Sequence, residues 1–186
     1  MPERRAVFLD RDGTIVEDPP PGYLHEAGKV RLLPGAATAI HRLNESGFLV
    51  ITVSNQSGIA RGLYTVAEYT AVQRRLGELL AAHGAHLDGA YFCPHHPDVT
   101  GPCACRKPGT QLFRDAAAAL GIDLARSWFV GDRLSDVEPA AALGGRGLLV
   151  TTGEGERDAA AARGRGMKVA ADLSAAAALV TDSETR

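Results

Sequence analysis

The sequence predicts an α/β protein built on a doubly wound, mostly parallel β-sheet. Short apolar runs alternate with stretches of helical period along most of the chain, and within each run the apolar residues are continuous. Continuous runs are typical of strands covered on both faces, and alternation of strand with helix is typical of βαβ units. The 186 residues are enough to bury one core, so we expect a single domain spanning residues 1–186.

Six apolar runs are predicted as strands. Phe48–Val53 is the clearest, because it is a continuous apolar run rich in β-branched residues. The other predicted strands are Ala6–Leu9, Ala90–Phe92, Trp128–Val130, Gly147–Val150 and Lys168–Ala170.

Five intervening stretches are predicted as helices, most of them ending at a glycine. They are Ala36–Ser46, Val66–His83, Gln111–Leu120, Ser135–Leu143 and Ser174–Val180. Thr65 and Glu68 form a capping-box pattern before the second helix. Pro139 lies inside the fourth and must either fall in a first turn or kink the helix. Residues 153–167 are predicted as a loop or an exposed helix.

Composition and charge exclude several classes of protein. Apolar residues make up 45% of the chain and charged residues 23%, which excludes wholesale disorder. The net charge of −2 gives no indication of a nucleic-acid or membrane partner, and no run approaches the ~18 apolar residues of a membrane span. The apolar run near the N-terminus is too short for a secretory signal. We therefore expect a cytoplasmic protein and, because no heptad or apolar surface stripe is evident, a monomer.

A pair of acids follows the first predicted strand. Asp10 and Asp12 are two residues apart, so on an extended chain both carboxylates point to the same side. They lie beyond the carboxyl end of the strand, where open α/β sheets bind ligands, and Gly13 permits a turn there. Taken alone, the pair is equally compatible with a strand that ends in solvated acids.

Three further polar segments are predicted at the same edge. Ser54-Asn55-Gln56-Ser57-Gly58 follows the second strand and suits an oxyanion, Arg106-Lys107-Pro108 precedes a helix, and Gly131-Asp132-Arg133 follows the fourth strand. Each alone is compatible with a polar turn or a surface pair. Together with the acid pair they provide a nucleophile, an acid/base, a phosphate cradle and a magnesium ligand. Asp136 is interpreted either as a residue that supports this site or as a favourable acid at a helix N-terminus.

The three cysteines are clustered between residues 93 and 105. An odd number in so short a segment argues against disulfides, and three thiolates with one imidazole make a closed, structural Zn²⁺ site. Either His95 or His96 can supply the imidazole. The alternative is a set of free cysteines beside a surface histidine. Residues 94–105 show no periodicity, so something other than a core must order this predicted zinc-binding loop.

This order of motifs resembles the haloacid dehalogenase superfamily of phosphatases. Within it, four strings are similar to the D-glycero-D-manno-heptose 1,7-bisphosphate phosphatase family, and histidinol-phosphate phosphatase domains share most of them. The strings are Asp10-Arg11-Asp12-Gly13-Thr14-Ile15, Asn55-Gln56-Ser57-Gly58-Ile59-Ala60-Arg61-Gly62, Cys93-Pro94-His95-His96 and Cys103-Ala104-Cys105-Arg106-Lys107-Pro108. The resemblance spans about residues 6–153 and implies a Rossmann-like fold without a large cap domain.

The resemblance also implies roles for individual residues. Asp10 is expected to be the nucleophile that takes the phosphoryl group, and Asp12 to protonate the leaving oxygen and later activate water. Mg²⁺ is expected on the Asp10 carboxylate, the Asp12 backbone carbonyl and Asp132. The expected zinc ligands, with His95 preferred over His96, are Cys93, His95, Cys103 and Cys105. The expected substrate- and phosphate-binding residues are Gly22, Tyr23, Ser54, Asn55, Gln56, Ser57, Arg106, Lys107 and Arg133.

The implied activity is Mg²⁺-dependent removal of the C7 phosphate from D-glycero-D-manno-heptose 1,7-bisphosphate through an aspartyl-phosphate. A histidinol-phosphate phosphatase has the same chemistry, but Arg61, Arg106 and Arg133 suit a second phosphate. A phospho-receiver module is an alternative from another class, and it has no need of Asp12. A metal-stapled binding protein with a dead site is disfavoured by the complete residue set.

The chain departs from the family pattern around the leaving group. Val16 stands where the family usually has Asn, and the first loop carries Pro19-Pro20-Pro21. Pro108-Gly109-Thr110 replaces the usual Pro-x-Pro-Gly, whereas Ser54 keeps the hydroxyl of the common Thr. The resemblance therefore fixes the phosphoryl chemistry but not the sugar or its anomer.

Overall fold

A computed structural model describes residues 4–18 and 22–183. It holds one six-stranded sheet, in which every neighbouring pair of strands is parallel and the order is β3-β2-β1-β4-β5-β6. The strands are β1 (Ala6–Leu9), β2 (Leu49–Asn55), β3 (Gly89–Cys93), β4 (Trp128–Gly131), β5 (Arg146–Val150) and β6 (Lys168–Ala170). The predicted fold class and all six strands are confirmed: β1 and β6 have the predicted bounds, and no end of the other four is shifted by more than two residues. Pro19-Pro20-Pro21 lies outside the described residues.

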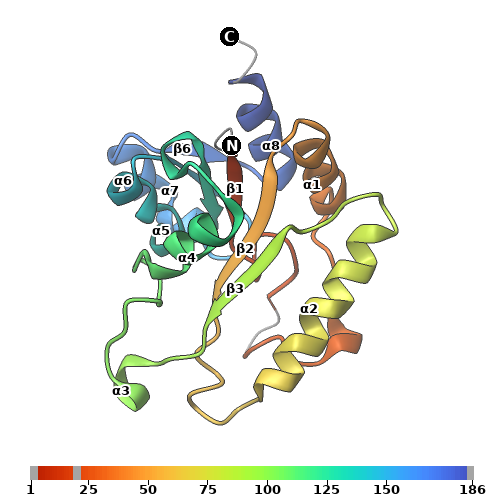
Figure 1. Cartoon of the computed structure of the whole chain (residues 1–186), viewed down its shortest axis with the longest axis vertical. Helices are drawn as coiled ribbons and strands as arrows, with labels where there is room; N and C mark the ends of the chain where they lie inside the picture. The colour runs from red at the N-terminus through yellow and green to blue at the C-terminus, as the bar shows by residue number, and fades with distance from the viewer. Residues whose placement is uncertain (1–3, 19–21, 184–186) are drawn as a thin grey trace.

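Helices cover both faces of the sheet, with α1, α2 and α8 on one side and α4 to α7 on the other (Figure 1). The α-helices are α1 (Ala36–Glu45), α2 (Val66–Ala81), α3 (Pro97–Thr100), α4 (Gln111–Leu120), α5 (Leu134–Val137), α6 (Pro139–Leu143), α7 (Gly155–Gly164) and α8 (Leu173–Asp182). Two 3₁₀ turns are η1 (Ala27–Lys29) and η2 (Leu124–Arg126).

Strand β1 shows how the sheet builds two cores. Val7 and Leu9 belong to the core cluster shared with α1, α2 and α8, whereas Ala6 and Phe8 belong to the cluster shared with α4 and α6. All four side chains are buried, as expected for a strand whose successive residues face opposite, helix-covered faces.

The structure refines two sequence predictions on helices and adds one helix that the sequence did not predict. Pro139 is the first residue of α6, so the predicted helix Ser135–Leu143 is broken into α5 and α6 at Glu138. The helical alternative for residues 153–167 is confirmed by α7. The short α3 was not predicted, because four residues opened by Pro97 carry no periodic signal.

The register brings the carboxyl ends of β1, β2 and β4 together. Leu9 pairs with Thr52 of β2 and with Val130 of β4, and the Asp10 amide donates to the Val130 carbonyl at 2.9 Å. Chain segments that leave this edge therefore start within reach of one another, although they are far apart in the sequence.

Candidate active site and metal-binding loop

A buried lysine lies between two carboxylates at this edge. Lys107 Nζ is 2.7 Å from Asp10 Oδ1 and 2.8 Å from Asp136 Oδ1, and it donates to the Val53 carbonyl at 2.5 Å. Burial lowers the pKa of Lys107, but the two carboxylates outweigh burial and raise it above its ordinary value. Lys107 is therefore a fixed positive charge beside Asp10.

Three carboxylates form a group suited to a divalent cation. Asp10, Asp132 and Asp136 each bring an oxygen within 4.8 Å of the others. Asp132 Oδ2 accepts from the Glu154 amide at 2.8 Å, while Oδ1 is buried with no hydrogen-bond partner among the described residues. Burial raises the pKa of Asp132 to about 6 and raises that of Asp10 well above its ordinary value. A hard cation bound by oxygen ligands would satisfy this orphaned atom and offset both burial costs.

Two glycines make room for Asp132. A Cβ atom at Gly13 or Gly153 would overlap the Asp132 carboxylate, and both glycines have positive φ. Gly13 was predicted only as a turn residue; its closeness to Asp132 depends on the packing of β1 beside β4, which local sequence does not reveal.

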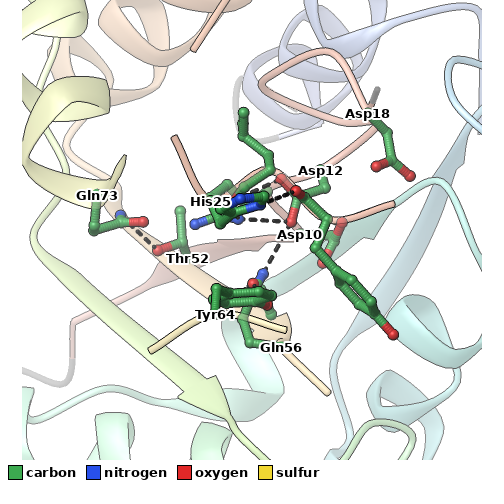
Figure 2. Close-up of polar contacts among 12 residues, drawn as sticks. Asp10, Asp12, Asp18, His25, Thr52, Gln56, Tyr64 and Gln73 are labelled. Atoms are coloured by element: carbon green, nitrogen blue, oxygen red, sulfur yellow. Dashed lines mark hydrogen bonds and ion pairs between the residues drawn. The ribbon is translucent and has the colours of Figure 1, made fainter. Parts of the chain in front are cut away.

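Asp12 is held by groups outside the carboxylate trio. The buried Arg11 donates from Nε to Oδ1 at 3.0 Å and from Nη2 to Oδ2 at 2.9 Å. Gln56 Nε2 donates to Oδ2 at 2.9 Å, and Figure 2 shows its side chain reaching Asp12 with Tyr64 beside it. The Asp12 side chain keeps 21% of its surface exposed, so it remains accessible from the cavity that it lines.

The loop after β2 places some side chains at the wall of the cavity and others behind that wall. Asn55 bonds the backbone of Lys107 twice, donating to its carbonyl at 3.2 Å and accepting from its amide at 3.0 Å. Ser57 Oγ lies 3.1 Å from the Tyr23 hydroxyl at the cavity wall. Ser54 and Gln56 are buried, and the Gln56 amide contacts Ser54 Oγ at 3.3 Å, so both lie behind the wall.

A cavity of about 570 Å³ opens over these groups. Its lining includes most of the predicted catalytic and substrate-binding residues, namely Asp10, Asp12, Gly22, Tyr23, Asn55, Ser57, Arg106, Lys107 and Arg133. Arg61, Arg106 and Arg133 give it three cationic groups. A cavity with a lysine beside the Asp10 carboxylate and arginines around it suits a small, multiply charged anion.

The three cysteines and His95 converge on one point. Their sulfur atoms lie 3.1 to 3.6 Å apart, and His95 Nδ1 is 3.2 Å from Cys105 Sγ and 3.8 Å from Cys93 Sγ. No disulfide links the cysteines, and the four ligand atoms fit the donor set of a closed tetrahedral Zn²⁺ site. The cluster starts at the last residue of β3 and ends two residues before Lys107.

Comparisons with known proteins agree with this geometry. A family model described as HAD-hydrolase-like matches residues 104–176. The D-glycero-beta-D-manno-heptose-1,7-bisphosphate 7-phosphatase of Yersinia pestis is 42% identical over 155 residues, which cover 80% of this chain and 81% of the relative. The chain belongs to the haloacid dehalogenase-like family of heptose-bisphosphate phosphatases.

Other members of the heptose-bisphosphate phosphatase family match equally broadly. The D-glycero-D-manno-heptose-1,7-bisphosphate 7-phosphatase of Thermosynechococcus vestitus is 44% identical over 163 residues, covering 83% of this chain and 82% of that protein. The D,D-heptose 1,7-bisphosphate phosphatase of B. bronchiseptica, solved with magnesium and phosphate, has a TM-score of 0.87 and 36% identity, covering 96% of this chain and 99% of that one. Among the described residues no helix is long and apolar enough to span a membrane.

Some residues of this phosphatase site escaped sequence reasoning. His96, weighed only as a rival zinc ligand, lies at the cavity with its Nε2 2.6 Å from Arg61 Nη2. His25, interpreted as a surface or packing residue, stacks on Tyr64 with ring centroids 5.7 Å apart. Asp136 fills both of its predicted roles: its Oδ1 contacts Lys107 Nζ within the site, and its Oδ2 accepts from the Arg133 amide at the start of α5 at 2.9 Å. The sequence carried no signal for the positions of His25 and His96, which depend on contacts with Tyr64 and Arg61.

Proposed function

We propose that this chain hydrolyses the C7 phosphate of D-glycero-D-manno-heptose 1,7-bisphosphate through an aspartyl-phosphate on Asp10. The observation that carries the proposal is the 2.7 Å pair of Asp10 and Lys107 in a cavity with three arginines. The names of the relatives in Yersinia pestis and Thermosynechococcus vestitus support the substrate. The Yersinia name further favours the β anomer.

In the proposed reaction Asp10 attacks phosphorus and the bond to the sugar oxygen breaks. Lys107 holds the charge of the transferring group, and Asp12 gives its proton to the leaving oxygen. Asp12 then takes a proton from the water that cleaves the aspartyl-phosphate. Mg²⁺, for which Asp10, Asp132 and the Asp12 carbonyl are the proposed ligands, would suppress the repulsion between carboxylate and phosphate.

The remaining predicted residues divide between contact and support. Asn55 and Ser57 are proposed to bind the transferring phosphate, and Arg106 and Arg133 the rest of the substrate with Gly22 and Tyr23. For Ser54 and Gln56 their burial supports a role behind the phosphate site rather than in direct contact with it.

Structural Zn²⁺ is proposed on Cys93, His95, Cys103 and Cys105. Four protein ligands leave no open position for chemistry. Arg106 Nη1 donates to the His95 carbonyl at 3.4 Å, so the ordered loop delivers Arg106 and Lys107 to the cavity. We further propose that the chain acts as a cytoplasmic monomer and a single domain.

The alternative activities have less support. A phospho-receiver module needs a long-lived aspartyl-phosphate, whereas Asp12 lines the cavity, where the proposed base would hydrolyse such an intermediate. A histidinol-phosphate phosphatase needs no second anion site, and the relatives named above are all heptose-bisphosphate phosphatases.

The test is phosphate release with Mg²⁺ from both anomers of the heptose bisphosphate, from histidinol phosphate and from fructose 1,6-bisphosphate. Strong preference for one heptose anomer, absent in Asp10→Asn, is the expected result. Preference for histidinol phosphate would overturn the substrate and leave the chemistry intact. No repeated turnover of any substrate would overturn the phosphatase proposal.

A further inference from the structure

We infer that Tyr64 and Gln56 are positioning residues for Asp12, and that they aim its carboxyl group at the leaving oxygen and at the attacking water. The inference deepens the proposed function, on which it rests. It stands on a chain of two hydrogen bonds: the Tyr64 hydroxyl donates to Gln56 Oε1 at 2.5 Å, and Gln56 Nε2 donates to Asp12 Oδ2 at 2.9 Å.

Tyr64 fixes which end of the Gln56 amide faces Asp12. Gln56 is buried, so its carbonyl oxygen requires a donor. Tyr64 supplies that donor, and burial raises the pKa of its phenol, which keeps the hydroxyl protonated. With its carbonyl satisfied, the amide presents its N–H groups to Asp12 and to Ser54 Oγ.

The position of Tyr64 is itself closely determined. Its ring stacks on His25 and lies 5.6 Å from the Tyr23 ring. A Cβ atom at Gly58 would overlap the Tyr64 ring, so only glycine at residue 58 leaves room for it. Tyr64 is 4% exposed and does not line the cavity, so its effect on Asp12 passes through Gln56 and not through contact with substrate.

Gln56 completes a three-donor set on Asp12. Arg11 bonds both oxygens from one side, and Gln56 adds a second donor to Oδ2 only. Among the described residues the two oxygens therefore differ: Oδ1 has one donor and Oδ2 has two. This asymmetry leaves Oδ1 as the oxygen with more free acceptor capacity toward the cavity.

The two chemical steps use Asp12 differently, so loss of its positioning should change their rates to different extents. In the first step Asp10 bonds to phosphorus, the bond to the leaving oxygen breaks and that oxygen takes the Asp12 proton. In the second step water bonds to phosphorus, its proton goes to Asp12 and the bond to Asp10 breaks. p-Nitrophenolate leaves without a proton, so with p-nitrophenyl phosphate only the second step needs Asp12.

The experiment compares Gln56→Leu, Gln56→Glu and Tyr64→Phe in rapid-quench and steady-state assays with Mg²⁺. We expect kcat for a sugar phosphate to fall about tenfold or more, whereas phosphorylation by p-nitrophenyl phosphate changes less than ~2-fold and a burst of p-nitrophenolate appears. Gln56→Glu keeps the acceptor for Tyr64 but removes the donor to Asp12, and it should be at least as impaired as Gln56→Leu.

Two controls separate positioning from a general structural role. Tyr91→Phe removes a hydroxyl from a part-buried tyrosine on β3, away from Asp12, and should behave as wild type. In an Asp12→Asn background, adding Gln56→Leu should cause no further loss of kcat.

Two outcomes would overturn the inference. One is equal loss of both chemical steps in Gln56→Leu and Tyr64→Phe, and the other is a further loss of kcat on top of Asp12→Asn. Either can occur while the wild-type protein hydrolyses the heptose bisphosphate, so failure of this inference is distinguishable from failure of the proposed function.

Discussion

Two regions form the sides of one cavity in different ways: the edge of the sheet that carries the acids, and the predicted zinc-binding loop of residues 94–105. Asp10 and Asp132 follow β1 and β4, in which every residue is buried between helices. Between Cys93 and Lys107, by contrast, no residue is buried, and α3 stands away from the body of the molecule (Figure 1). Core packing fixes the first side, whereas the proposed zinc, bound by four ligand atoms at the base of the loop, would fix the other.

Because the two sides are held in different ways, we expect that one can lose its structure while the other keeps it. Lys107 joins them, because it enters from the loop and ends between Asp10 and Asp136. Perturbing the loop should therefore displace the lysine and leave the acids without their cation, while β1 and β4 keep their backbone structure. Perturbing the acids should leave the loop intact.

The largest effect is expected from Asp10→Asn. An amide cannot attack phosphorus, so kcat should fall by at least ~10³-fold, while the metal content of the loop stays that of wild type. Phosphate release and zinc analysis measure the two results. Residual activity near that of wild type would show that Asp10 is not the nucleophile.

Lys107→Met should impair both catalysis and stability. It leaves Asp10 and Asp136 buried without their shared cation, and breaking a buried ion pair costs about 3–5 kcal/mol of unfolding free energy. Urea unfolding measures the cost, with the exposed Lys29→Met as the matched control. An unchanged midpoint of urea unfolding would contradict the role of Lys107 as the link between the two sides.

Cys105→Ala should loosen the loop while the sheet keeps its structure. Loss of one ligand should release the segment that delivers Lys107 and lower kcat/KM by about 10–100-fold. Hydrogen exchange should accelerate in residues 94–107 and stay slow in β1 and β4. Faster exchange throughout the sheet would contradict independent failure of the two sides.

These features differ in how far the sequence reveals them. Asp10, Asp12 and Asp132 were predictable because each follows an apolar run that is confirmed as a strand. The grouping of Cys93, Cys103 and Cys105 was predictable from spacing, whereas the choice of His95 over His96 came from the family resemblance. The cluster is confirmed, and the zinc ion itself stays a prediction.

Other features depend on contacts that no local pattern carries. The pair of Lys107 and Asp10 spans 97 residues, and it exists because β1 and β2 are neighbours in the sheet. Arg11 was interpreted only as part of a motif, yet it is fully buried against Asp12. The link from Tyr64 to Asp12 through Gln56 likewise requires the three-dimensional course of the loop after β2.

The smallest expected effect is a pH-dependent stabilisation by Mg²⁺. Burial raises the pKa of Asp132 to about 6, so in the metal-free protein its contribution to stability is lost as the pH rises from its ordinary pKa to about 6. Above that range the ionised carboxylate is free to bind Mg²⁺, whereas below it the metal must displace a proton. The rise in Tm on adding Mg²⁺ should therefore be larger near ~pH 7.5 than near ~pH 5. Equal shifts would show that Asp132 is not a ligand.

Trapping the covalent intermediate would test directly whether Asp10 takes the phosphoryl group. Enzyme mixed with heptose bisphosphate labelled in its C7 phosphate is quenched in acid within one turnover and digested. We expect label on the peptide that contains Asp10, its disappearance on further turnover and its absence in Asp10→Asn. Label on another residue, or none while phosphate is still released, would contradict this role of Asp10.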